Sequence, residues 1–455
     1  MAPPPQAAPF RAEQALLSLG EPFYDPVEPA RFPEHRLRFR NDRAAVEVGL
    51  AGLSHAEWLA HFARFDPLPG SLPQPLALRY HGHQFRVYNP DIGDGRGFTF
   101  AQLRDGRGRL MDLGTKGSGQ TPWSRFGDGR LTLKGGVREV LATEMLEALG
   151  VQTSRSFSLV ETGEALERGD EPSPTRSAVL VRLSHGHIRI GTFQRLAYHQ
   201  DREAMERLVA YVLANFFGEQ PGDDGPVRLL DHVVAGTARL AASYMAAGFV
   251  HGVLNSDNIN VTAESFDYGP WRWAPTWQPD FTAAYFDHAG LYAFARQPEA
   301  IHWDAMQLAV SLRLLAEAEP LIAVLESFPD RFQTAFAEAL HWRLGRKPGV
   351  DPRALARAVE QALLATQAPL DRFFFDAFAQ PLPATYADPA WDEARARLAE
   401  ATPRSDRSHP YWWGEPCSML IEEVEAIWAP VAETDDWTRF DAKIAAVRAM
   451  GDAMA

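Results

Sequence analysis

The stretch Gly248–Gly269, GFVHGVLNSDNINVTAESFDYG, carries the most specific pattern in this chain. A helical apolar pattern precedes it and is expected to end at Gly248, because glycine suits the left-handed residue that often closes a helix. A polar loop follows, then an expected short strand at Ile259–Val261, and Asp267-Tyr268-Gly269 closes a predicted hairpin. Helix, polar loop, strand and acidic turn therefore come in this order.

Two side chains of this stretch suit a divalent cation. Asn258 offers an amide oxygen and Asp267 a carboxylate, which are ligands that Mg²⁺ or Mn²⁺ prefers. In protein kinases an H-R-D-x-x-x-x-N loop and a D-F-G turn place such a pair on the metal. Here His251-Gly252-Val253 replaces H-R-D, so Asp257 is the nearby carboxylate that can accept a proton. A structural turn capped by Asn and Asp is the alternative.

Upstream of this stretch lies a glycine-rich turn, Gly93-Asp94-Gly95-Arg96-Gly97, between two expected strands. Glycines let backbone N–H groups approach a phosphate, and Arg96 would add a positive charge. An ordinary hairpin turn accounts for the same residues, since such sequences are common in turns.

A lysine and a glutamate follow this turn along the chain. Lys116 comes after a strand in LGTKGSGQTPWSRFGDGR, and Glu139 lies in the first turn of a helix predicted at Val137–Gly150. Glu139 could pair with Lys116 and orient it toward phosphate. A solvated lysine and a surface glutamate are the plain alternative. The order of glycine-rich turn, strand lysine and helix glutamate matches a kinase N-lobe, although the motif is not V-A-I-K.

Two arginines, Arg182 and Arg189, stand in VLVRLSHGHIRIG. Their guanidinium groups could hold phosphates as forks, or they could form salt bridges in this acidic chain.

The hydrophobic patterns predict an α+β, two-lobed chain. We expect an N-terminal extension over residues 1–75 with short helices and Pro-rich connections, a β-rich nucleotide-binding lobe over 76–197, and a helical lobe over 198–455 that carries the catalytic loop. A cleft between such lobes is a common ligand site.

Composition narrows the function classes. The net charge of −14 over 455 residues disfavours a nucleic-acid binder with a broad basic face. Cys417 is the single cysteine, so no internal disulfide can form, and we expect a reducing cytoplasm.

The N-terminal MAPPPQAAPFRAEQALL lacks the pattern of a targeting signal, and the longest apolar stretch, residues 232–253, is interrupted by charge, so we expect no membrane span. A monomer is the default expectation.

Six segments, PDIGDGRG, TKGSGQTPWSRFGDGR, VREVLATEMLEALG, HIRIGTFQ, HGVLNSDN and FDYGP, occur in this order between about Tyr80 and Leu308. Together they resemble the selenoprotein O (SelO/YdiU) family of protein adenylyltransferases. The resemblance implies a kinase-like fold that binds ATP inverted, so that AMP is transferred to Ser, Thr or Tyr hydroxyls of proteins, with the chain itself among the candidate substrates.

The resemblance also implies roles for individual residues. Nucleotide contacts are implied for Gly93, Gly95, Arg96, Lys116, Asp128, Gly129, Arg182, Arg189 and Asp267, with Glu139 orienting Lys116. Asp257 would accept the proton, Asn258 and Asp267 would bind Mg²⁺ or Mn²⁺, and ATP would be the co-substrate. Ordinary phosphoryl transfer and a nucleotide-sensing pseudokinase without turnover are the competing hypotheses.

Three departures from the family pattern stand out. The usual YAGHQFG is YHGHQFR here, which adds His81 and Arg86. The segment Asp287–Tyr292, DHAGLY, lacks the arginine of the usual D-x-x-G-R-Y. The C-terminal region from His409 onward does not match the usual ending, and Cys417 is expected to be a buried apolar residue rather than a redox sensor.

Overall fold

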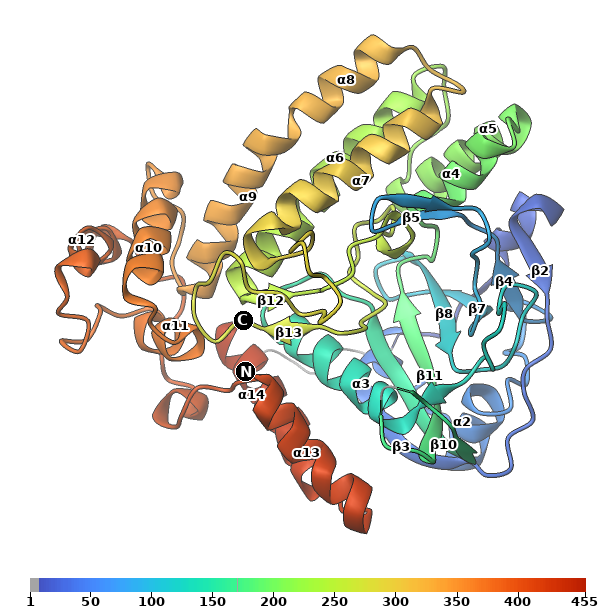
Figure 1. Cartoon of the computed structure of the whole chain (residues 1–455), viewed down its shortest axis with the longest axis horizontal. Helices are drawn as coiled ribbons and strands as arrows, with labels where there is room; N and C mark the ends of the chain where they lie inside the picture. The colour runs from blue at the N-terminus through green and yellow to red at the C-terminus, as the bar shows by residue number, and fades with distance from the viewer. Residues whose placement is uncertain (1–7, 170) are drawn as a thin grey trace.

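The computed structural model describes residues 8–169 and 171–455. Residues 1–7, which begin the N-terminal stretch without a targeting pattern, lie outside the described residues. A β-rich part precedes a helical part (Figure 1), which confirms the predicted α+β class. The first part contains β1 (Ala12–Glu13), β2 (Tyr24–Pro26), β3 (Arg36–Arg40), α1 (Asp42–Glu47), α2 (His55–Phe62), β4 (Leu76–Leu78), β5 (Gly82–Gln84), β6 (Val87–Asn89), β7 (Thr99–Arg104), β8 (Leu110–Lys116), β9 (Leu131–Thr132), α3 (Leu133–Ala148), β10 (Arg155–Leu166) and β11 (Thr175–Ser184). The second part contains α4 (Ile190–Tyr198), α5 (Arg202–Val212), α6 (Gly225–Ala247), β12 (Phe249–Val250), β13 (Arg272–Trp273), α7 (Gln297–Leu312), α8 (Ala318–Glu326), α9 (Phe328–Arg343), α10 (Pro352–Thr366), α11 (Leu370–Ala377), α12 (Asp392–Glu400), α13 (Ile421–Thr434) and α14 (Thr438–Met454).

The main sheet has the strand order β2-β4-β7-β8-β11-β10-β3, with β1 added to β7 and β9 to β11, and its neighbours run antiparallel. Side chains alternate between its faces as the period of two requires. Along β11, Val179 and Val181 pack with Trp58 of α2, whereas Leu180 belongs to the core shared with α3. The sheet is therefore covered on both faces, and α3 packs beside β10 and β11 (Figure 1).

Strands from residues 10–75 belong to this sheet, which the sequence did not predict. β3 pairs with β10, β2 with β4, and β1 with β7. These strands are short, and β3 reads RLRFR, so its alternation of Leu37 and Phe39 with arginines is brief. The helical expectation holds at α1 and α2, which begin at Asp42 and His55.

The glycine-rich segment Gly93–Gly97 does not close a hairpin between paired strands, contrary to the expectation. β6 pairs with β5 in a separate two-stranded sheet, whereas β7 pairs with β4 and β8. Gly93 forms an isolated bridge with Arg79. The segment therefore connects two different sheets.

α6 ends as predicted, because Gly248 adopts φ +70° and its N–H bonds back to Met245 O. The prediction of a strand at Ile259–Val261 is wrong. The short 3₁₀ helix η4 (Ser256–Asn258) is followed by a single bridge between Asn260 and Arg189. The Asn260 side chain donates to Gly186 O and accepts from Thr262 N, and these bonds hold the backbone in a turn.

The last two helices return to the first part and cover α3 (Figure 1). Arg448 of α14 forms a two-pronged ion pair with the buried Glu144 of α3, with both N–O distances at 2.7 Å. Gly451 lies so close to α3 that a Cβ there would come within 3.2 Å of the Ala148 Cβ. Among residues 8–169 and 171–455, no helix has the length and apolar character needed to cross a membrane.

Candidate active site

A cleft of about 800 Å³ opens between the sheet and the loops that follow α6. Its walls include eleven of the predicted site residues: Gly93, Gly95, Arg96, Lys116, Asp128, Gly129, Arg182, Arg189, Asp257, Asn258 and Asp267. Glu139 lies behind Lys116 rather than in the wall. Residues 174 positions apart in the sequence therefore meet around one cavity.

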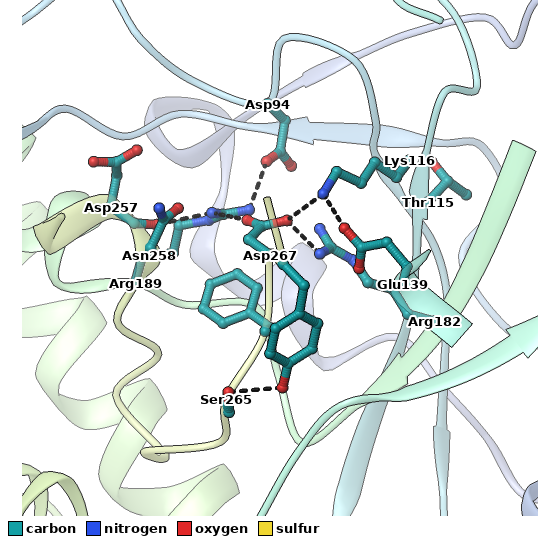
Figure 2. A network of polar contacts seen from close by, with 12 residues as sticks. Asp94, Thr115, Lys116, Glu139, Arg182, Arg189, Asp257, Asn258, Ser265 and Asp267 are labelled. Carbon is teal, nitrogen blue, oxygen red and sulfur yellow. Dashed lines mark hydrogen bonds and ion pairs between the residues drawn. The ribbon is translucent and has the colours of Figure 1, made fainter. Parts of the chain in front are cut away.

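Lys116 and Glu139 form a buried ion pair at the back of the cleft (Figure 2). Lys116 is the last residue of β8, and both side chains are at most 6% exposed. Burial lowers the pKa of Lys116, and the carboxylate of Glu139 opposes this change. α3 begins at Leu133, four residues before the predicted start, because Thr132 caps it through Gly135 N, so Glu139 stands in the second turn and not the first.

Asp267 is the centre of the ionic cluster. Its carboxylate pairs with Arg182, accepts from Arg189 Nη1 at 2.7 Å, and lies 3.8 Å from Lys116 Nζ (Figure 2). Burial works to raise the pKa of Asp267, but Arg182, Arg189 and Lys116 hold that pKa well below its usual range. Asp267 therefore stays ionised.

Arg189 connects this cluster to two other segments. Its guanidinium contacts Asp94 Oδ1 at 3.3 Å and donates to the backbone oxygen of Asp257 at 2.8 Å. The cluster thus contains three basic side chains (Lys116, Arg182, Arg189) and three acidic ones (Glu139, Asp267, Asp94). Its charges nearly balance, so an entering polyanion would compete with the carboxylates for the same cations.

Asp257 is a carboxylate outside the ionic cluster. It belongs to η4, is 7% exposed, and points away from Asp267 in Figure 2. Its Oδ1 is buried, with no hydrogen-bond partner among the described residues. Burial raises the pKa of Asp257 to about 6, so near neutral pH it is an ionised base whose proton affinity exceeds that of an ordinary aspartate.

Asn258 follows directly and lines the same cleft. Its Nδ2 donates to Val253 O at 3.0 Å, and this bond fixes the orientation of the amide. The amide oxygen is then the atom that can accept a hydrogen bond or coordinate a cation.

The glycines of the Gly93–Gly97 segment are required by packing. A Cβ at Gly93 would lie 2.5 Å from the Trp123 ring, and one at Gly95 would lie 2.8 Å from the Trp123 carbonyl oxygen. Arg96 is exposed, and its carbonyl accepts from Gly117 N at 2.6 Å. The segment is thus pressed against its neighbours, which adds a second reason for glycine besides the approach to phosphate.

Asp128 lies at the cleft mouth and is already paired. It contacts Arg168 Nη1 at 2.8 Å and caps Arg130 N at 2.9 Å, and its side chain is 47% exposed. Gly129 adopts φ +70°, and a Cβ there would come within 2.2 Å of Gly119. These residues shape the rim, and Asp128 could reach a ligand only by sharing or leaving Arg168.

Sequence reasoning did not select several residues of the site, among them Asp94, Gln84 and Trp123. Asp94 belongs to the glycine-rich segment Gly93–Gly97, but aspartate is so common in turns that its presence there does not indicate a site residue. Gln84 and Trp123 come from segments whose position over the cleft depends on long-range packing.

Known proteins resemble this chain over most of its length. The family model described as "Protein adenylyltransferase SelO" matches residues 7–402. The chain is 42% identical to a "Protein nucleotidyltransferase YdiU" of Synechococcus elongatus, over 97% of this chain and 96% of that protein. A protein of the same name from Gloeobacter violaceus is 44% identical over 94% of this chain and 93% of its own length.

A more distant relative of the same name, from Vibrio cholerae, is 36% identical over 72% of this chain and 66% of its own length. The family model ends at residue 402, whereas the Synechococcus alignment continues past it, since 97% of the chain is covered. The family model and these relatives agree on one enzyme class, the transfer of nucleotides to proteins, for which ATP and protein substrates are implied. This chain belongs to the SelO family of protein adenylyltransferases.

Proposed function

We propose that this chain transfers AMP from ATP to Ser, Thr or Tyr hydroxyls of proteins, its own included, and releases pyrophosphate. The observation that carries the proposal is that a cluster of buried cations and a separate buried carboxylate, Asp257, line one cleft. The cations can neutralise the negative charge of a triphosphate, and the carboxylate can accept a proton. Positioning and electrostatics of this kind supply most of the catalysis in transfers from nucleotides.

The proposal includes an inverted orientation of ATP, as the resemblance to the family implies. We place the β- and γ-phosphates among Lys116, Arg182 and Arg189, at the buried end of the cleft. Glu139 then holds Lys116 in place through their ion pair. The α-phosphate would lie toward Asp257.

The transfer balances with Asp257 as the base. The acceptor hydroxyl gives its proton to the Asp257 carboxylate as its oxygen bonds to the α-phosphorus. The bond from the α-phosphorus to the bridging oxygen breaks, and pyrophosphate leaves with the bonding electrons. The buried cations stabilise that leaving group because its negative charge grows as the bond breaks.

Asn258 and Asp267 fit the Mg²⁺ or Mn²⁺ of the proposal by donor type. Both offer oxygen, Asp267 is held ionised, and the Asn258 amide is fixed by its bond to Val253 O. Among the described residues no group of three His, Cys, Asp or Glu side chains gathers to hold a metal by itself. Phosphate and water oxygens would therefore share the coordination. When bound, such a cation would neutralise phosphate charge.

The proposal includes a kinase-like arrangement, with residues 76–197 as the nucleotide-binding lobe and 198–455 as the helical lobe. The order of strand lysine, helix glutamate, loop asparagine and acidic turn supports it. His251-Gly252-Val253 lacks the kinase base, which favours transfer of AMP over transfer of the γ-phosphoryl group. We place the reaction in the cytoplasm, since the one cysteine is buried and free, and we take a monomer as the default.

Labelled ATP tests the proposal. Purified protein is incubated with Mg²⁺ or Mn²⁺ and a protein mixture, with ATP labelled at the α-phosphate in one reaction and at the γ-phosphate in the other. Label on protein from the α-position alone, lost in Asp257→Asn, is expected. Label from the γ-position alone would identify a kinase, and no label with ATP still bound would favour a nucleotide sensor.

A further inference from the structure

The hairpin of β5 and β6, Gly82–Asn89, lies outside the main sheet and packs on the catalytic loop Asn255–Asn258. Its backbone binds two side chains of that loop. His83 N donates to Ser256 Oγ at 2.7 Å, and Phe85 N donates to Asn255 Oδ1 at 3.0 Å. The hairpin therefore holds the two residues that immediately precede Asp257.

Gln194 of α4 completes these contacts. Ser256 Oγ donates to Gln194 Oε1 at 2.6 Å, and Gln194 Nε2 lies 2.7 Å from His83 Nδ1. Ser256 and Gln194 are both buried, so these bonds do not compete with bulk water. Hairpin, catalytic loop and α4 thus form one hydrogen-bonded unit.

Asp257 itself rests on the first strand of the hairpin. A Cβ at Gly82 would lie 2.8 Å from Asp257 Oδ1 and 2.9 Å from Asp257 Cβ. Gly82 does not have a positive φ, so the space beside Asp257, and not backbone conformation, requires glycine at this position.

Gln84 stands two residues along the same strand and lines the cleft. It is near enough to Asp257 to lower the pKa of that carboxylate, which opposes the effect of burial. Asn89 Nδ2 donates to Gln84 Oε1 at 3.0 Å, which leaves the Gln84 amide N–H groups for the carboxylate.

The turn of the hairpin is anchored at its far side. Arg86 adopts φ +63°, and its guanidinium contacts Glu299 at 3.1 Å. It also lies over the Trp303 ring at 5.4 Å. Both partners belong to α7, so the hairpin bridges the catalytic loop and a long helix.

We propose that the hairpin Gly82–Asn89 positions the proton acceptor of the transfer reaction, with Gly82 as the surface beneath the Asp257 carboxylate and Gln84 as the residue that orients it. Both are positioning residues, and the inference rests on the proposed function of Asp257. It predicts that changes in the hairpin alter the transfer step and leave ATP binding intact, because the cation cluster is formed by other segments.

The test compares Gly82→Ala with Gly52→Ala, a glycine beside which a Cβ would meet nothing within 4 Å. Transfer of α-label is measured at saturating ATP, and ATP affinity is measured separately by calorimetry. We expect Gly82→Ala to lower the transfer rate about 100-fold, the effect of misplacing a catalytic group by about 1 Å, with the ATP Kd within about threefold of wild type. Gly52→Ala should match wild type in both measurements.

Gln84→Ala serves as the second variant, since this partly exposed side chain can be shortened without a clash. It should lower the transfer rate and not the ATP affinity. Wild-type transfer rates in Gly82→Ala and Gln84→Ala, or parallel losses of transfer and ATP binding in the folded variants, would overturn the inference. If Gly82→Ala does not fold, Gln84→Ala decides alone. A wild-type protein without α-label transfer would instead refute the proposed function.

Discussion

Replacing Asp267 by Asn should separate the binding of ATP from its dependence on metal. In the free protein Asp267 neutralises Arg182 and Arg189, and in the proposed complex it holds the cation. Asp267→Asn leaves three basic and two acidic side chains in the cluster. We therefore expect ATP to bind more tightly without metal than it does to the wild type, and Mg²⁺ to add little.

The magnitude follows from Coulomb's law. One charge about 6 Å from a phosphate, at an effective dielectric constant of about 20, contributes about 3 kcal/mol, and solvent in the open cleft reduces this to about 1–3 kcal/mol, or about 5- to 150-fold in Kd. Removing one member of a buried ion pair also costs about 3–5 kcal/mol of stability. With an unfolding entropy of about 2.1 cal/mol/K per residue, the melting temperature should fall by about 3–5 °C.

Calorimetric titration with ATP, in Mg²⁺ and in chelator, measures both quantities. Asp94→Asn is the matched control, because Asp94 lines the same cleft and contacts Arg189 at 3.3 Å but is not assigned to the metal. It should strengthen ATP binding in both buffers and keep the wild-type ratio between them. The reasoning is refuted if Asp267→Asn also keeps that ratio.

Three further outcomes are expected. Lys116→Met should weaken ATP binding at least about tenfold in calorimetry, while Glu139→Gln, which keeps a hydrogen-bonding partner for Lys116, should weaken it less. Equal effects would contradict this expectation, because they would mean that a neutral partner does not orient Lys116. Burial raises the pKa of Glu264 to about 7 from its usual 4.5, so its ionised form costs stability above pH 7 and this cost disappears as the pH falls toward 4.5. Glu264→Gln should therefore stabilise the fold by about 3 kcal/mol at pH 8 and about 1 kcal/mol at pH 5.5; thermal unfolding that shows the same gain at both pH values would contradict this. Burial also raises the pKa of the Cys417 thiol, so the native protein should react slowly with alkylating reagents and Cys417→Ala should leave transfer unchanged, whereas rapid labelling would count against a purely packing role.

Local patterns predicted the elements that build the site more accurately than the contacts within it. β8, α3 and α6 carry strong periodicity, and Gly248 ends α6 as expected, so Lys116 and Glu139 could be placed on a strand and a helix. Their pairing was inferred from order along the chain. The structure forms that pair, because β8 and α3 meet across β11.

The parts of the site that the sequence did not predict depend on contacts between residues far apart in the chain. Arg182 reaches Asp267 across 85 residues, and the hairpin reaches Ser256 across 173. No local pattern marks such partners. The strand predicted at Ile259–Val261 failed for the same reason, since the side chain of Asn260 binds Gly186 O, 74 residues away, and holds the backbone in a turn.

The return of α14 to α3 sets the order in which a growing chain can complete this site. Glu144 lies on α3, the helix that also carries Glu139. Its ion-pair partner, Arg448, comes more than three hundred positions later in the chain. A chain of four hundred residues therefore contains every group of the cleft, but the side of α3 that α13 and α14 later cover is still exposed. A chain that has not yet reached α14 therefore has the reactive groups of the cleft before it has the ion pair that joins α14 to α3.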